Sequence, residues 1–300
     1  MVLLGILVLC VFILARLSDK FFTVANLLTS TRYAVEVGLI GIPMTMIIIT
    51  RGIDLSVASN LALSAMLLGL SWRNLGLSIW AAALVGLAVG TLGGLLNGLV
   101  VAKLRVPPLV VTLATLAVYR GVATGLGKGR GVTGFPEEFS FLGHGTIGPA
   151  PVQLLIWVLA IVLAAIVLAR TAFGRQLYAI GHNELAARFA GVNVDRLKVI
   201  LYTLSGFLCG LAAAIYVARV ETAKSNAATG YELRVITAVV LGGTNINGGE
   251  GSVLGTTLGV LIVTVLNNGL NLARVPDPAQ DVLIGCVLVL AVLAYQRRRS

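Results

Sequence analysis

Long apolar runs follow one another along almost the whole chain and are separated by short polar stretches. Most of these runs are long enough to cross a bilayer as a helix, which takes about 20 residues. A membrane β-barrel would instead show alternating segments of about ten residues. The pattern therefore predicts an all-α polytopic membrane protein with about ten transmembrane segments, at residues 2–17, 33–50, 54–72, 76–102, 106–126, 150–170, 199–220, 231–246, 251–272 and 277–296.

Three of these segments are less regular than the others. The segment at 106–126 contains Arg120, and the segment at 231–246 is short, so either could be a broken or re-entrant helix. Residues 2–17 have the length of a secretory signal but lack a basic leader and an A-x-A cleavage site. We expect them to form the first transmembrane helix.

Composition supports a membrane protein. The chain is 58% hydrophobic and 11% charged, whereas soluble domains are about 25% charged. Its net charge is +10, and the basic residues stand mostly at the ends of apolar runs, where they contact lipid head groups. The expected partner of these charges is membrane lipid and not nucleic acid. The cysteines lie within apolar runs and the histidines are far apart, so no metal site or cofactor is expected.

The stretch at 170–198 is the charged exception. It holds seven charged residues, and at about 3 kcal/mol each they would cost roughly 20 kcal/mol at the centre of a bilayer. This stretch must therefore lie in water or against another protein. The charged residues are Arg170, Arg175, Glu184, Arg188, Asp195, Arg196 and Lys198.

A short helix is predicted within this stretch. Asn183 is a good N-cap, Glu184 suits the positive end of a helix, and Gly191 suits the position after the C-cap. Small residues lie between them, at Ala186, Ala187 and Ala190, and could fit a cleft of a partner protein. A solvated connector is the alternative interpretation.

Orientation is less well determined by the charges. The 22 Lys and Arg residues divide evenly, 11 on each side of the expected topology. The two densest basic clusters, at 170–198 and 297–299, place both segments in the cytoplasm by the positive-inside rule.

Glycines recur every four residues in two segments. Residues four apart share one face of a helix, and small side chains let helices approach closely in lipid. We expect these faces to pack inside the bundle. They comprise Gly86, Gly90, Gly94 and Gly98, and then Gly251, Gly255 and Gly259.

Two sequence matches suggest an internal repeat. The first match is between Asn97-Gly98-Leu99 and Asn268-Gly269-Leu270. The second is between the runs that follow these, Arg105-Val106-Pro107 and Arg274-Val275-Pro276. The expected topology gives these helices opposite directions, which is typical of an inverted-topology repeat in transporters.

Polar residues within the apolar segments need partners, because lipid offers none. They either join helices by hydrogen bonds or line a pathway for a neutral, hydroxyl-rich solute. Carboxylates in mid-span are scarce, which disfavours ion coupling. The candidates are Asp54, Asn60, Asn97, Asn267, Asn268 and Asn271.

No nucleotide-binding motif is found in the chain. Gly127-Lys128 is followed by Gly129 instead of Ser or Thr, so there is no P-loop, and no G-x-G-x-x-G follows a strand. If transport is active and not ion-driven, its energy must come from another polypeptide.

Several motifs resemble those of one family, the permease subunits of bacterial ATP-binding-cassette importers for ribose, xylose, rhamnose and autoinducer-2. They span nearly the whole chain and include 52–57 (GIDLSV), 96–98 (LNG), 173–175 (FGR), 191–193 (GVN), 238–244 (AVVLGGT) and 267–270 (NNGL). The resemblance implies a type II importer-like fold, with residues 1–300 as one transmembrane permease domain in the bacterial inner membrane. It also implies that the helix from Asn183 to Gly191 is the coupling helix.

The function expected from this resemblance is inward passage of a monosaccharide, such as a pentose, a deoxyhexose like rhamnose, or a related autoinducer. The implied partners are a cytoplasmic ATPase, a periplasmic sugar-binding protein and a second permease subunit, identical or different. The alternative is an ion-coupled carrier or facilitator for a neutral polar solute. A membrane enzyme is not expected, because Asp54, His182 and Glu250 form no catalytic pattern.

Overall fold

The computed structural model describes residues 3–5, 7–8, 11–12, 21–276, 279–280, 282–283, 285–287 and 289. The long helices are α2 (Val24–Ile49), α3 (Val57–Leu75), α4 (Ile79–Lys103), α5 (Pro108–Gly127), α7 (Val152–Arg170), α10 (Val194–Val220) and α12 (Val253–Leu272). The short helices are α6 (Glu137–His144), α8 (Ala172–His182), α9 (Glu184–Phe189) and α11 (Tyr231–Leu241). Most of the segments predicted at 2–17 and 277–296 lie outside the described residues.

Six helices in the described part of the chain are long and apolar enough to cross a membrane, namely α2, α4, α5, α7, α10 and α12. The expected number of ten is not confirmed. The segment at 54–72 forms α3, but its buried face carries Ser59, Asn60 and Ser64, which lower its hydropathy. Within the segment at 231–246 the helix α11 has only 11 residues and ends at Leu241, with Gly242 as its C-cap. The segment at 106–126 is the continuous helix α5.

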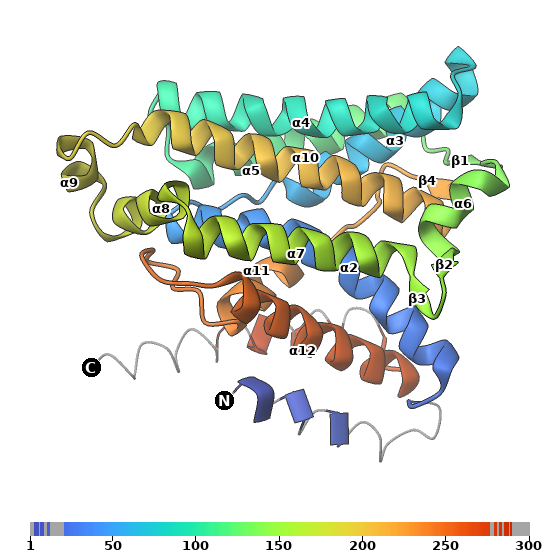
Figure 1. Cartoon of the computed structure of the whole chain (residues 1–300). Helices are drawn as coiled ribbons and strands as arrows, with labels where there is room; N and C mark the ends of the chain where they lie inside the picture. Colours follow the sequence, from blue (N-terminus) through green and yellow to red (C-terminus); the bar gives the residue numbers. More distant parts are fainter. Residues whose placement is uncertain are drawn as a thin grey trace.

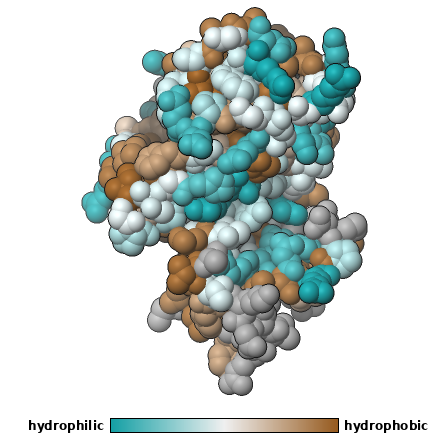
Figure 2. Space-filling model, turned by 90° about the vertical axis from the view of Figure 1, so that its right-hand side faces the viewer, coloured by the Kyte–Doolittle hydropathy of each residue, from teal (hydrophilic) through white to brown (hydrophobic). Residues whose placement is uncertain are grey.

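The long helices lie side by side as a bundle with two distinct ends (Figure 1). One end carries α8 and α9. The other carries α6 and two short ladders, in which β1 (Val132–Thr133) pairs with β4 (Thr222–Ala223) and β2 (Thr146–Ile147) pairs with β3 (Ala150–Pro151). Figure 2 views the molecule from the α6 end and shows hydrophilic residues gathered there.

Helix α10 packs on α4, α3 and α2. Its crossing with α4 is made by glycine on both sides. A Cβ on Gly90 or Gly94 would collide with the backbone of α10 at Gly206, and a Cβ on Gly206 would collide with α4 in return. Gly98 faces Val199 and Gly86 faces the backbone of Ser64 in α3. These contacts bring the helix backbones together without intervening side chains.

The second glycine series is divided between a loop and a helix. Gly255 and Gly259 lie in α12 and face the carbonyls of Gly242 and Ala238, so they let α11 pack closely. Gly251 precedes the helix, which begins at Val253, and it has φ +159°. The expected continuous helical face therefore starts at Gly255.

Helices α4 and α12 run in opposite directions (Figure 1). Two residues beyond the end of each helix lies an arginine with a left-handed backbone, Arg105 at φ +55° and Arg274 at φ +57°. Non-glycine residues rarely adopt this conformation, so the equivalence supports the inverted repeat suggested by the sequence.

Candidate functional site

Helix α9 is defined by its two caps. The Asn183 side chain accepts a hydrogen bond from the backbone N–H of Ala186 at 3.0 Å. At the other end, Val192 N–H donates to the Ala187 carbonyl and Gly191 N–H to the Arg188 carbonyl, with Gly191 at φ +82°. This pair of bonds is a Schellman motif. The caps fix a six-residue helix that would be marginal by itself.

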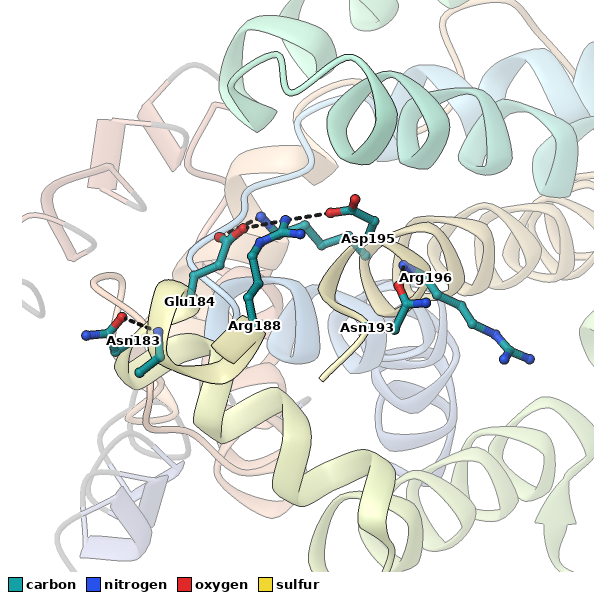
Figure 3. Close-up of polar contacts among 8 residues, drawn as sticks. Asn183, Glu184, Arg188, Asn193, Asp195 and Arg196 are labelled. Atoms are coloured by element: carbon teal, nitrogen blue, oxygen red, sulfur yellow. Dashed lines mark hydrogen bonds and ion pairs between the residues drawn. The ribbon is translucent and has the colours of Figure 1, made fainter. Parts of the chain in front are cut away.

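Four charged side chains tie α9 to the start of α10 (Figure 3). Glu184 accepts hydrogen bonds from Arg188 at 3.0 Å and from Lys198 at 2.7 Å, and Arg188 also pairs with Asp195. Partial burial of Glu184 favours its neutral form, but the hydrogen bonds from Lys198 and Arg188 outweigh this and lower its pKa. The network holds α9 in one orientation at the end of the bundle.

The outward face of α9 contains two of the three small residues that the sequence places on it. Ala187 is buried and packs against the bundle, whereas Ala186 and Ala190 are exposed. Beside them project Leu185, 64% exposed, and Phe189, 84% exposed. These two residues are one helical turn apart, and neither belongs to the capping or alanine pattern by which the sequence predicts this helix.

The backbone of the α8–α9 junction is held against the rest of the bundle by contacts with the end of α2 and the turn after it. Arg51, in the turn after α2, donates from Nε to the Gly181 carbonyl at 2.8 Å and from Nη2 to the His182 carbonyl at 2.9 Å. A Cβ on Gly181 would collide with the Ile49 carbonyl and with Gly249. Sequence motifs far apart in the chain thus meet beside α9.

A polar cavity of about 460 Å³ lies away from α9, between α2, α11 and α12. Its volume is within the usual range for small-molecule pockets. Asn267, Asn268 and Asn271 all line it, so the structure brings these three predicted residues together. The other lining residues include Ser30, Tyr33, Thr229, Tyr231, Arg234, Thr264 and Gln280.

The amides in the cavity wall have few partners outside it. Asn268 exchanges hydrogen bonds with Asn26, at 2.7 and 3.0 Å, and Gln280 donates to Asn271 at 2.9 Å. Asn267 donates to the carbonyl of Val263, and its own side-chain oxygen has no hydrogen-bond partner among the described residues. The Asn267 oxygen is therefore an acceptor in this wall that no donor among the described residues occupies.

The other three predicted residues lie elsewhere, in a buried network between α3, α4 and α10. Asp54 accepts from the Ser56 hydroxyl at 2.6 Å and from the Ser205 hydroxyl at 3.0 Å. Asn97 donates to Ser56 at 2.8 Å, and Asn60 donates to the Gly90 carbonyl at 3.0 Å. These hydrogen bonds have partners within the helix bundle, as expected for polar residues that join helices and do not line a solute pathway.

An ion pair behind the cavity was not recognised as part of a site from the sequence. Glu36 on α2 is fully buried and pairs with Arg219 on α10. Tyr231 donates to Glu36 at 3.0 Å, and the Arg219 guanidinium lies 4.3 Å from the centre of the Tyr33 ring. Both tyrosines line the cavity. In the sequence, Glu36 lies within the apolar run at 33–50, and nothing there indicates its partner.

A bundle of membrane-length helices, with a charged helix at one end and a polar cavity between helices, defines a multi-pass membrane transport protein. The chain belongs to the family described as the permease component of branched-chain amino acid transport systems, whose model matches residues 26–292. This membership confirms the sequence-based assignment to the permeases of the bacterial inner membrane, and the expectation that the chain is not an enzyme.

The chain is similar throughout its length to several curated permeases. It is 41% identical to the ribose import permease protein RbsC of Bacillus subtilis, over 99% of this chain and 92% of that protein. It is 40% identical to RbsC of Escherichia coli K12, over 96% and 90%. The autoinducer 2 import system permease LsrD of Photorhabdus luminescens is 33% identical, over 92% and 84%.

The fold is also seen in a solved transporter structure. It is a metal-chelate type ABC transporter in an inward-facing conformation, with a TM-score of 0.53 and 18% identity, covering 98% of this chain and 97% of that one. At this identity the similarity concerns the fold alone.

Proposed function

We propose that the chain is the membrane-spanning permease subunit of an ATP-binding-cassette importer and carries a monosaccharide inward by alternating access. The observation that carries the proposal is the 41% identity to a ribose import permease over 92% of that protein's length. A pentose such as ribose is the favoured substrate. A deoxyhexose such as rhamnose and an autoinducer-type sugar derivative are the other substrates to be tested.

The amide-lined cavity suits such a substrate. Sugars present several hydroxyls, each a donor and an acceptor, and Asn and Gln side chains offer both functions at fixed positions. Tyr33 and Tyr231 add aromatic surface to the same cavity. We therefore assign Asn267, Asn268 and Asn271 to the substrate pathway, and Asp54, Asn60 and Asn97 to the packing of the bundle.

The energy of ATP hydrolysis would be transmitted to this chain through α9. Leu185 and Phe189 present apolar surface beside the charged network of Glu184, Arg188, Asp195 and Lys198. Such an exposed apolar pair on a rigid, capped helix fits a groove of a partner protein. We assign the coupling contact with a cytoplasmic ATPase to this helix, which places the α9 end in the cytoplasm and the α6 end outside, facing a sugar-binding protein.

Uptake of radiolabelled ribose into proteoliposomes tests the proposal. The chain would be reconstituted with the ATPase and the binding protein encoded beside it, and with a second permease subunit if one is encoded there. We expect uptake that requires ATP, the ATPase and the binding protein together, and competition by unlabelled ribose stronger than by rhamnose. Uptake by the chain alone, driven by an imposed proton or sodium gradient, would refute the proposal and identify an ion-coupled carrier.

A further inference from the structure

A wholly apolar groove of about 400 Å³ runs along the outside of the bundle between α7 and α10. Its floor is formed by Ile42 and Met46 of α2, which are buried. Its rims are formed by exposed residues of the two flanking helices, such as Leu163 of α7 and Phe207 of α10. The groove is thus open toward the surroundings of the bundle, which in a membrane are lipid.

The dimensions of the groove match a lipid acyl chain. On α7 it extends from Ile156 to Val167, which corresponds to about 16 Å at 1.5 Å per residue. One leaflet of a bilayer has a hydrocarbon depth of about 15 Å. A single acyl chain therefore fills the groove lengthwise.

Each flanking helix carries an arginine at the α9 end of its groove-facing side. On α7, Arg170 lies three residues after Val167 and so on the same face. On α10, Arg196 precedes Ile200 and Leu204 at intervals of four residues, again on one face. Both arginines are exposed. Within the part of the chain that the structure describes, neither forms an ion pair.

The side chain of Arg196 also points in a different direction from those of its charged neighbours. Its neighbours Arg188 and Asp195 belong to the charge network of α9, whereas the Arg196 side chain points away from that network (Figure 3). Its guanidinium therefore remains available to an anion outside the network.

We propose that this groove is a binding site for an anionic phospholipid, with one acyl chain between α7 and α10 and the phosphate held by Arg170 and Arg196. Basic residues between membrane helices, next to an apolar surface, are the usual form of such a site. A second copy of the chain fits this face less well. A two-fold axis through the groove would place the four arginines of the two copies at the same depth, where like charges repel.

Native mass spectrometry of the full chain in detergent, titrated with dioleoyl phosphatidylglycerol or dioleoyl phosphatidylcholine, tests the proposal. We expect one phosphatidylglycerol to bind more tightly than the zwitterionic lipid. Replacing both arginines (R170Q/R196Q) should weaken phosphatidylglycerol binding about 30-fold, since each cation contributes about fivefold near an anionic head group. The matched control is R130Q, which removes an exposed arginine from the other end of the bundle.

A second variant tests the groove itself. Ala160→Phe fills it while both arginines remain, and should also abolish the single tight site. Equal binding of the two lipids by the unchanged chain would overturn the proposal, as would undiminished phosphatidylglycerol binding by R170Q/R196Q and A160F. So would a dimer of the unchanged chain that A160F dissociates, because that result would assign the groove to a second copy.

Discussion

Arg219 donates two hydrogen bonds to Glu36, from Nε to Oε1 at 2.7 Å and from Nη2 to Oε2 at 3.0 Å. The two residues are 183 positions apart and join α2 to the end of α10. Because the guanidinium and the carboxylate are planar and paired at two points, the relative rotation of the two helices is fixed as well as their separation.

Replacing only one member of this ion pair should lower the stability of the protein. Glu36→Gln leaves the buried Arg219 without a counter-charge, and we expect a loss of about 3–5 kcal/mol in stability. The double variant E36Q/R219M should lose less than the sum of the two single variants. Thermal unfolding of the purified protein measures this, with exposed Glu137→Gln as control. Additive losses would show that the pair is not coupled.

The crossing of α4 and α10 should tolerate no side chain at Gly94. A Cβ there would overlap the Tyr202 carbonyl and the backbone of Gly206, and we expect Gly94→Ala to cost about 1–3 kcal/mol or more. Gly121→Ala is the matched control, since Gly121 is also helical and a Cβ there meets nothing within 4 Å. Equal melting temperatures for the two variants would contradict the close packing.

The exposed apolar pair on α9 should matter for coupling and not for folding. L185A/F189A should reduce ATP-driven uptake at least tenfold and leave the melting temperature of the isolated chain within about 1 °C, because neither side chain is buried in it. Leu75→Ala, also strongly exposed, is the control. Normal uptake by L185A/F189A would remove α9 from the coupling role.

The two groups of polar residues should respond differently to substitution. Asn267→Leu and Asn271→Leu remove hydrogen-bonding groups from the cavity wall, so we expect KM for sugar uptake to rise about tenfold with little change in stability. Asn97→Leu instead leaves Ser56 and Tyr119 without their shared partner and should lower the melting temperature. Uptake kinetics and thermal unfolding of all three variants distinguish the two roles.

The charge network of α9 should depend on pH. The pKa of Glu184 is lowered in the folded chain, so its stabilising effect is present above the ordinary carboxylate range and is lost as pH falls through the folded pKa. The melting-temperature difference between the unchanged chain and Glu184→Gln should therefore be largest near neutral pH and vanish in acid. A difference that stays constant as pH falls to about 3 would exclude the ionised form as the cause.

Local rules predicted the features that depend on neighbouring residues. The limits of α9 followed from Asn183 and Gly191, because capping requires only a side-chain acceptor at one end and a left-handed backbone at the other. Helical character followed from the length of the apolar runs. Both are properties of a short window of sequence.

Features that depend on distant residues could not be predicted in this way. The buried face of α3 includes the polar residue Asn60, which donates a hydrogen bond to the Gly90 carbonyl of α4. Such residues lower the hydropathy of α3, and a rule based on apolar runs cannot anticipate the partner that makes them tolerable. The grouping of six polar candidates into a cavity and a packing network depends on which helices become neighbours. The same is true of the direction of Ala187, which is set by the packing of α9 against the bundle and not by its small size.

Helix α2 connects the two ends of the bundle. Its last turn and the following Arg51 hold the α8–α9 junction, and its first half contributes Ser30, Tyr33 and Val37 to the cavity wall. Pro43 lies between these parts and has no N–H for the carbonyl of Leu39, so the helix is mechanically weakest there. In the coupling role that we propose for α9, a movement of α9 would reach the cavity through α2, and the bending stiffness of α2 at Pro43 would set how much of that movement is transmitted.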